Sequence, residues 1–408
     1  MTLSFFMPSV TGIEAQSHAM TTVSMNIANM RTVGYKNQST MFYTMLGTRP
    51  VSSNNQAGLS SSRADILGVG YYDRTAVTRQ GEIAQTGNNY DVAINGNGNA
   101  FFAVRDEDGS IYYTRAGDFA TRAVSGIPYL VTNNGLYLQG FAANGDGTFS
   151  NSLTDLRIDY PNSVPSTPTT RVEIQANVPA NGVDDSTYGM TFYGPEHDGK
   201  SVIMRFTKVD GKVGVWEVNF TAQDGTVSMA PQEVHFSQDG ELLSPKTLSL
   251  GVTWSDGTSN PNVTIDISSM TQFTGNSGIT SMLNNGRPSG GFITGYIDND
   301  GILKAKYTNG DVLDYAQIAL VGFVAPENLT NVTGTLFGYN TAVGNQFYVS
   351  GPNAYNRQIF VPGAVESSTS NVEEDFANMI LIQRAYAMNG KTFTAANEMM
   401  MQVVNLKT

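Results

Sequence analysis

The C-terminal stretch 371–408 has the pattern of one long amphipathic helix. Its apolar side chains recur three or four residues apart, which predicts a heptad seam packed against a second helix. Ser370 and Glu373 have the spacing of a capping box, so we expect Ser370 to cap this helix. At about 1.5 Å per residue the helix would run roughly 50 Å, longer than a small domain needs. The candidate seam residues are Phe376, Met379, Ile382, Tyr386, Phe393, Met400 and Val403.

The other convincing helix lies at the opposite end of the chain, in residues 1–30. Its candidate seam residues, with the same spacing, are Ile13, Met20, Val23 and Ile27. Glu14 is the one formally charged side chain in this stretch, whereas a surface helix normally carries a charged outer face. Two interpretations stay open: an ordinary helix pair beside a globular core, or an element that finds its partners by assembly. The shortage of charge favours assembly.

Composition excludes several classes of partner and site. The chain has 408 residues, which predicts two to four domains, and a net charge of −12, which argues against nucleic acid and against a basic membrane-binding face. It contains no Cys, so it has neither disulfides nor thiolate metal sites. No apolar run approaches the ~20 residues of a membrane span, so we expect no membrane insertion. The first residues lack a basic region and a cleavage site, so export would rely on uncleaved information.

Between the two helices the chain reads as short strands separated by Asn-Gly and Asp-Gly turns. A Pro-rich passage at 161–168 marks a connection between domains, and the hairpin pattern of the first β block returns near residue 290. The predicted fold is therefore mainly β with terminal α-helices: two nested β domains plus a helical coiled-coil domain. The predicted boundaries are a terminal helical domain at 1–30 and 371–408, linkers at 31–70 and 363–370, an inner β domain at 71–165 and 285–362, and an outer β domain inserted at 166–284.

No stretch has the pattern of a catalytic or metal site. The three His residues are isolated, and neither a P-loop nor a nucleophile elbow occurs. The segments 106–109 and 298–301 resemble halves of calcium loops, but they lack the later ligands and are better explained as hairpin tips. We therefore expect no enzyme activity, no cofactor and no metal. A carboxylate pair for glycan hydrolysis stays open, because its members need not be adjacent in sequence.

Four stretches, in this order, resemble the signatures of bacterial flagellar rod and hook proteins. They are 26–36, then 86–98 followed by Phe101 and Phe102, then 113–119 with 138–141, and finally 370–389. The resemblance covers the whole chain, most strongly at 20–36, 86–141 and 285–390. The signature residues are Asn26, Asn29, Thr32, Gly34, Tyr35, Lys36, Gly87, Asp91, Asn95, Gly96, Gly98, Asn371, Gln383 and Arg384.

This resemblance implies a structural homopolymer. The subunit would leave the cell through the flagellar export apparatus, add to the growing tip under a hook cap, and meet rod and hook-filament junction proteins in the extracellular flagellum. Its terminal helices would form an inner tube, with the seam residues at contacts between copies, and its β domains would form outer shells. The large predicted outer domain favours a subunit of the hook, a flexible curved tube that transmits motor torque as a universal joint. A distal rod component and, more remotely, a surface adhesin are the alternatives.

Overall fold

The computed structural model describes residues 3–49, 63–96, 98–181, 184–194, 199–350 and 360–405. The side chain of Val403, one of the predicted seam residues, lies outside this description, as do parts of the predicted linker and β domains. The chain divides into two compact units. One comprises Met1–Asp159, Gly295–Lys304 and Asp314–Thr408, and the other comprises Tyr160–Thr294 and Ala305–Leu313.

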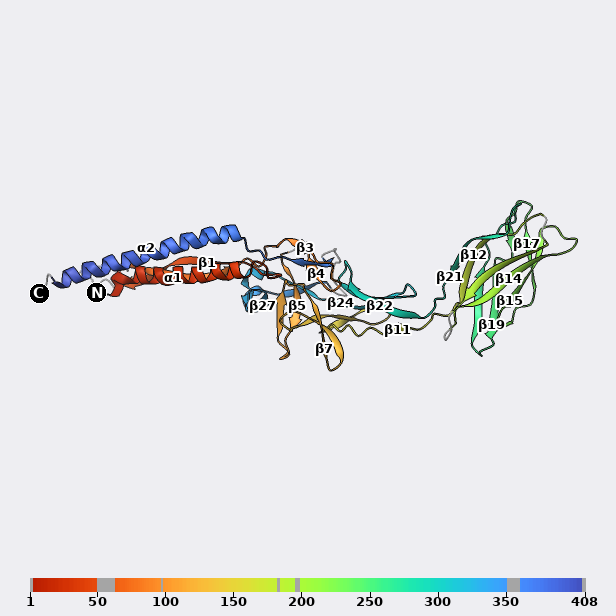
Figure 1. The fold of residues 1–408 in the computed structure, drawn as a ribbon, viewed down its shortest axis with the longest axis horizontal. Coiled ribbons are helices and arrows are strands. Elements are labelled where there is room, and N and C mark those ends of the chain that lie inside the picture. Colours follow the sequence, from red (N-terminus) through yellow and green to blue (C-terminus); the bar gives the residue numbers. More distant parts are fainter. Residues whose placement is uncertain are drawn as a thin grey trace, which may run out of the picture. The chain divides into compact units, whose positions relative to one another are not determined.

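A helix is present at each end of the chain, as predicted. Helix α1 (Leu3–Ala28) and helix α2 (Val372–Asn405) pack against each other in antiparallel orientation. The ring of Phe6 lies 5.4 Å from that of Phe393, while Asn26 at the other end of α1 approaches Asp375. Both chain ends therefore lie at the same end of the helix pair (Figure 1).

The predicted cap of α2 is wrong by one residue. The Oδ1 atom of Asn371 accepts a hydrogen bond from the backbone N–H of Glu373 at 3.0 Å. This is the geometry of an N-cap side chain that satisfies one of the first free N–H groups of a helix. Asn371 therefore caps α2, and Ser370 precedes the cap.

Small residues form most of the buried face of α1. Gly12, Ala15 and Ala19 are buried, whereas Ile13, Met20 and Ile27 are only half-buried. A Cβ atom on Gly12 would lie 2.8 Å from Nδ2 of Asn389 on α2. The backbones approach so closely that large side chains do not fit between them. Of the four α1 seam candidates only Val23 is fully buried within the chain, and a role for the others between copies stays a prediction.

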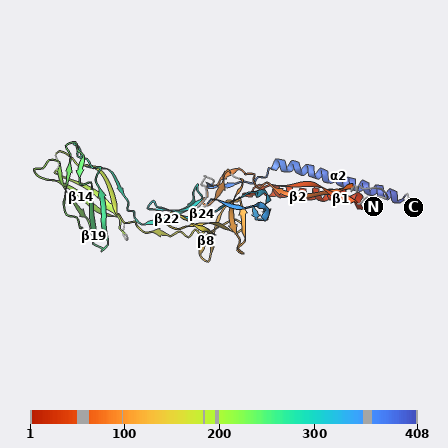
Figure 2. The ribbon, with the colours of Figure 1, turned by 180° about the vertical axis from the view of Figure 1, so that it is seen from behind.

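Residues expected to form a linker instead form a long β-hairpin. Strand β1 (Gln38–Arg49) pairs in antiparallel register with β2 (Arg63–Thr75), and the hairpin lies along α1 (Figure 2). The backbone N–H of Val69 donates to Oγ1 of Thr11 at 3.2 Å, and Gly68 lies directly against the same side chain. The scattered Gly, Ser and Arg residues of this region obscure the strand pattern in the sequence. The two strands are stabilised by packing against α1, and this long-range contact cannot be predicted from local sequence.

The rest of the first unit is a β region whose central strand is β5. It pairs with β6, β9 and β25, and rings of Phe101, Phe323 and Phe337 meet in its core. The short ladders β3–β30 and β4–β29 join the region to the segment before α2. The elements are β3 (Ile83–Gln85), β4 (Val92–Ile94), β5 (Ala100–Arg105), β6 (Ile111–Thr114), β7 (Ala120–Val124), β8 (Ile127–Val131), β9 (Tyr137–Ala143), β10 (Phe149–Asp155), β25 (Leu320–Phe323), η1 (Pro326–Asn328), β26 (Thr330–Asn331), β27 (Leu336–Gly338), η2 (Thr341–Val343), β28 (Gln346–Ser350), β29 (Phe360–Pro362) and β30 (Ala364–Glu366).

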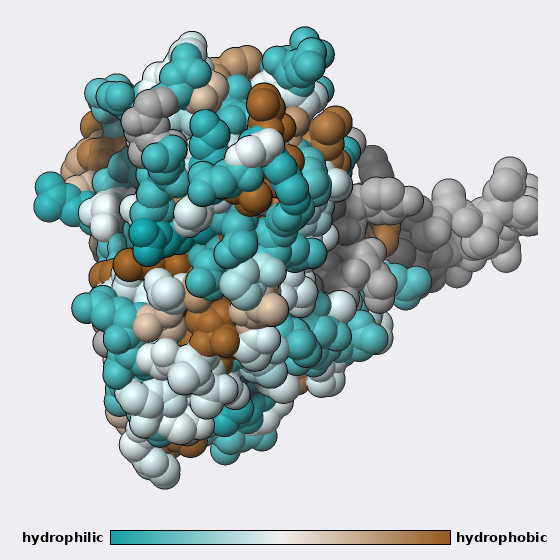
Figure 3. All heavy atoms as spheres, turned by 90° about the vertical axis from the view of Figure 1, so that its right-hand side faces the viewer, coloured by the Kyte–Doolittle hydropathy of each residue, from teal (hydrophilic) through white to brown (hydrophobic). Residues whose placement is uncertain are grey.

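The second unit contains two five-stranded sheets that enclose one apolar core, which includes Trp216 and Trp254. The sheet orders are β16-β19-β20-β12-β21 and β13-β14-β15-β17-β18. The face shown in Figure 3 is largely hydrophilic, with small separate hydrophobic patches. The strands are β11 (Ser163–Val164), β12 (Arg171–Asn177), β13 (Asp185–Phe192), β14 (Lys200–Lys208), β15 (Val215–Ala222), β16 (Gly225–Val227), β17 (Gln232–Phe236), β18 (Leu242–Ser244), β19 (Thr247–Trp254), β20 (Ser259–Asp266) and β21 (Gly278–Asn284). Strands β22 (Gly290–Ile297), β23 (Ile302–Tyr307) and β24 (Val312–Ile318) have residues in both units.

Candidate functional site

Three charged side chains from distant parts of the chain meet where the terminal helices join the first β region. Nζ of Lys36 lies 2.5 Å from Oε1 of Glu366, and Nη1 of Arg115 lies 3.4 Å from Oε2 of the same carboxylate. All three residues are completely buried. We call this group, Lys36, Arg115 and Glu366, the junction cluster. It ties the segment after α1 to the first β region and to the segment before α2.

The junction cluster holds one carboxylate between two cations. Glu366 also accepts a hydrogen bond from the backbone N–H of Gly81 at 2.8 Å, and the Lys36 ammonium donates to the carbonyl oxygen of Arg79. Burial lowers the pKa of Lys36, and the neighbouring carboxylate of Glu366 opposes that shift. The guanidinium of Arg115 lies 5.0 Å from the ring centroid of Phe101, where the π-face favours a cation. Glu366 is thus the carboxylate that the two cations share.

Asn26, another signature residue, connects the end of α1 with the loop and helix beside it. Its Oδ1 accepts from the Tyr35 hydroxyl at 3.1 Å and from the Gln38 backbone N–H at 3.0 Å. Its Nδ2 donates to the Gln38 carbonyl at 2.8 Å and lies 3.5 Å from Oδ1 of Asp375. Burial, and then the charge of Asp375, raises the pKa of Tyr35 to about 12, so the hydroxyl keeps its proton for this bond.

Gly34 has a steric role in the same junction. Its φ is +67°, and a Cβ atom there would lie 2.4 Å from the backbone nitrogen of Ala116. Its N–H donates to the carbonyl oxygen of Glu366 at 2.8 Å. The structure places this glycine beyond the end of α1, where a side chain would block contact with the β region.

The second signature forms a turn that holds the segment before α2. The carboxylate of Asp91 accepts from the Thr86 hydroxyl at 2.6 Å and from Nδ2 of Asn88 at 3.0 Å. The backbone N–H of Gly363 donates to the carbonyl oxygen of Asp91 at 2.8 Å, and the N–H of Gly87 donates to that of Gly363 at 3.0 Å. This turn and the junction cluster therefore anchor the same segment, residues 363–366.

The remaining signature residues are not all brought together. Nδ2 of Asn29 donates to the Met25 carbonyl at 2.9 Å, and its Oδ1 accepts from the Thr32 hydroxyl at 3.1 Å. A Cβ atom on Gly98 would lie 2.2 Å from the carbonyl oxygen of Thr78, so that position requires glycine. The other four are exposed, at turns or on α2: Asn95, Gly96, Gln383 and Arg384.

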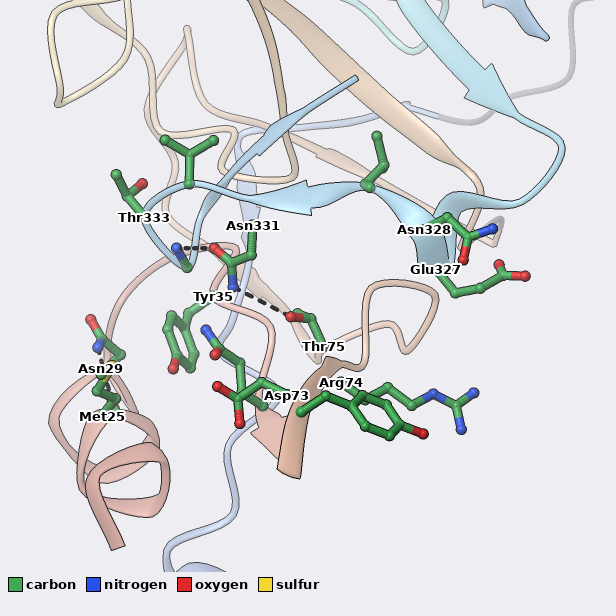
Figure 4. Close-up of a pocket in the computed structure, with 15 residues that line it drawn as sticks. Met25, Asn29, Tyr35, Asp73, Arg74, Thr75, Glu327, Asn328, Asn331 and Thr333 are labelled. Carbon is green, nitrogen blue, oxygen red and sulfur yellow. Dashed lines mark hydrogen bonds between the residues drawn. The ribbon is translucent and has the colours of Figure 1, made fainter. Parts of the chain in front are cut away.

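A cleft of about 820 Å³ opens beside the junction (Figure 4). Met25 of α1, Asn29 just beyond its end, and Asp73 and Arg74 of β2 line it, together with residues 327–329 and 331–334. Its lining is mostly amides and hydroxyls, and Nδ2 of Asn331 donates to the Thr75 hydroxyl at 3.3 Å across it. Within the described ranges no group of three or more His, Cys, Asp or Glu residues could hold a metal ion. No helix of the described part is long and apolar enough to cross a membrane.

Sequence reasoning identified Lys36 but missed Arg115 and Glu366 as its partners. Arg115 occurs within the third signature stretch, and Glu366 follows the apolar pair Ala364 and Val365 in a short strand. A charged residue directly after buried strand residues is the signal that was available. This signal does not reveal which residues pair with one another, because Lys36, Arg115 and Glu366 are far apart along the chain.

Three family models match successive parts of the chain. The flagellar hook protein FlgE/F/G D1 domain matches residues 93–183, the flagellar basal body protein FlaE D2 domain matches 166–287, and the flagellar basal body rod FlgEFG protein C-terminal region matches 361–406. The flagellar hook protein FlgE of Rhizobium meliloti is 29% identical and aligns over 98% of this chain and 97% of its own. The chain belongs to the flagellar hook protein family. The hook protein FlgE of Salmonella typhimurium is 26% identical over 98% of this chain and 100% of its own.

Among solved structures, the Helicobacter pylori flagellar hook protein FlgE2 aligns with a TM-score of 0.47 and 13% identity, over 72% of this chain and 99% of that chain. The relatives that align from end to end are hook proteins, so a rod component or an adhesin is not favoured. In this hook-family chain the signature residues around Asn26, Gly34 and Lys36 have a structural role. They join the two terminal segments to the first β region.

Proposed function

We propose that this chain is the structural subunit of a bacterial flagellar hook and that its terminal helices carry contacts between copies. The observation that carries the proposal is the apolar surface left open on α2. Phe376, Tyr386 and Phe393, three of the predicted seam residues, are 49%, 42% and 38% exposed, and Leu381 and Met388 are each 63% exposed. A helix with so much apolar surface in water is typical of an interaction face. In a hook, the partner is another copy of the subunit.

The two units suit different tasks in such a polymer. Apolar helix faces give strong, persistent contacts, so the helices would form the inner tube. The face that Figure 3 shows is largely hydrophilic, and it would make weaker contacts that can slide while the tube bends. The subunit would act without catalysis or a cofactor. It would be exported by the flagellar export apparatus and would contact rod, hook cap and hook-filament junction proteins at the two ends of the hook.

Electron microscopy of the purified protein tests this proposal. Full-length chain is salted out beside a version that lacks residues 1–30 and 371–408. We expect curved tubes from the full-length chain and a folded monomer from the truncated one, with hooks sheared from cells as the reference for tube shape. Tubes from both versions would place the contacts in the β units and would contradict the role of the helices.

A further inference from the structure

The outer face of the β1–β2 hairpin is an apolar surface without a partner in the described chain. Tyr71 stacks on His18 of α1 and Asp73 bonds to the same imidazole at 2.8 Å, so these side chains point toward the helix. Because side chains alternate along a strand, Tyr72 and its register partner Met41 point away. Tyr43 and Met45 share that outward face. We call Met41, Tyr43, Met45 and Tyr72 the hairpin patch. All four are exposed.

Strand β1 lacks the features that protect exposed edge strands in monomeric proteins. From Gln38 to Thr48 it contains no charged residue and no Pro. Soluble proteins usually place Lys, Glu or Pro on such strands, because an open apolar edge recruits other chains. An isolated two-stranded sheet is also marginal in water, and α1 covers only one face of this one. The hairpin patch therefore has the properties of a surface that is buried against another protein surface in an assembly.

A second copy of the chain has an exposed apolar surface that could pack against the hairpin patch. Leu381, Met388 and Met399 on α2 are spaced seven and eleven residues apart, which places them on one line along the helix, and all three are exposed. This line lies about 110° around α2 from the seam with α1, so it stays available when the two helices pair. Both surfaces are apolar. Contact between two different surfaces of identical subunits is heterologous, and such contacts build rings or open helical filaments.

We propose that the hairpin patch of one copy docks on the Leu381–Met388–Met399 line of a neighbouring copy. This inference rests on the proposed function, because it assigns one contact within the hook polymer. The hairpin would then add a second lateral contact beside the helices. A residue change on the hairpin would weaken the polymer without disturbing the fold of the monomer.

Cysteine cross-linking tests the pairing directly, because the chain has no Cys of its own. Hooks sheared from cells are treated with a short bismaleimide after introducing Tyr43→Cys, Met388→Cys, or both. We expect cross-linked dimers and longer ladders from the double variant alone. Ladders from Tyr43→Cys alone would indicate hairpin-to-hairpin contact, and dimers from Met388→Cys alone would indicate helix-to-helix contact. Either result, or intact hooks without any cross-link, would overturn the proposal.

A charge substitution gives a second measurement that does not depend on cross-linking. We expect Met45→Glu to leave the circular dichroism of the monomer unchanged and to abolish tube formation. Thr121→Glu, on an exposed position of β7, should still polymerise. Normal tubes from Met45→Glu would contradict the hairpin contact while leaving the hook function standing. Failure of the unmodified protein and of sheared hooks to show tubes would instead contradict the hook function.

Discussion

At the scale of single residues, the junction cluster shows how a buried charge can be structurally obligatory. Removing one partner of a buried ion pair leaves an uncompensated charge in a medium that solvates it poorly, whereas an exposed pair loses little. Glu366 is the common partner of Lys36 and Arg115, so its loss would expose both cations to that cost at once.

We predict that Glu366→Gln destabilises the first unit by about 3–5 kcal/mol, because two buried cations lose the carboxylate that they share. Native-state hydrogen exchange of the β5 amides, measured by mass spectrometry, would report the change. The amides of the second unit should exchange as before and serve as an internal reference. The matched control is Glu107→Gln, which breaks the exposed pair with Arg122 at 2.9 Å and should have little effect. Equal effects of the two substitutions would contradict the role of the cluster.

Asp375 gives a prediction about pH. Burial raises the pKa of Asp375 above its ordinary value, so the folded chain binds this proton more tightly than the unfolded chain does. The ionised carboxylate therefore lowers stability at neutral pH, and this penalty disappears as the pH falls below the ordinary aspartate range. We expect Asp375→Asn to raise the thermal midpoint at pH 7 and the difference to vanish near pH 3. Glu373→Gln, an exposed change in the same helical turn, should give no such gain.

At the scale of elements, the α1–α2 pair is built for close approach and leaves much of α2 open. Gly12, Ala15 and Ala19 let the backbones come together, and the side chains of α2 that reach across include Asn389. Gly390, the next residue, has no atom within 4 Å of where its Cβ would lie. The two glycines therefore differ: one is required by packing, and the other only weakens its helix.

We predict that Gly390→Ala increases the helicity of α2 and stabilises the helix by about 1 kcal/mol, because glycine loses more backbone entropy than alanine in a helix. Circular dichroism at 222 nm and the thermal midpoint would measure the change. Gly12→Ala is the matched control. Its new methyl group would press on Asn389, so it should bring no gain. A loss of helicity in Gly390→Ala would show that this glycine has a packing role within the folded chain.

At the scale of the whole molecule, the chain carries two units with separate cores. The core of the second unit is formed by both of its sheets and contains the two Trp residues of the chain, Trp216 and Trp254. Both are almost completely buried. Their fluorescence therefore reports on the second unit alone.

We predict that a fragment of residues 166–287 folds by itself. Its Trp emission should be blue-shifted, and its unfolding in urea should be cooperative, because the fragment retains all ten strands of the two sheets. A fragment that ends at residue 246 lacks β19, β20 and β21 and should remain unfolded. Emission typical of water-exposed Trp from the longer fragment would show that the second unit needs the rest of the chain.

Several local features of this protein are encoded within short stretches of its sequence. The two terminal helices follow from apolar spacing at 3.6 residues per turn, and many hairpin tips follow from Asn-Gly and Asp-Gly pairs that favour left-handed backbone. Each of these signals is formed by residues close together in sequence, so it can be recognised without knowing the fold. The family signatures were recognisable for the same reason.

The tertiary structure accounts for the features that local sequence patterns did not predict. It replaced the expected linker with the β1–β2 hairpin, shifted the cap of α2 from Ser370 to Asn371, and put small residues rather than large ones between the helices. It also brought Lys36, Arg115 and Glu366 into one buried cluster. Each of these outcomes depends on contacts between residues far apart in the chain. Local periodicity carries no information about which distant side chain will compensate a charge or cover a strand.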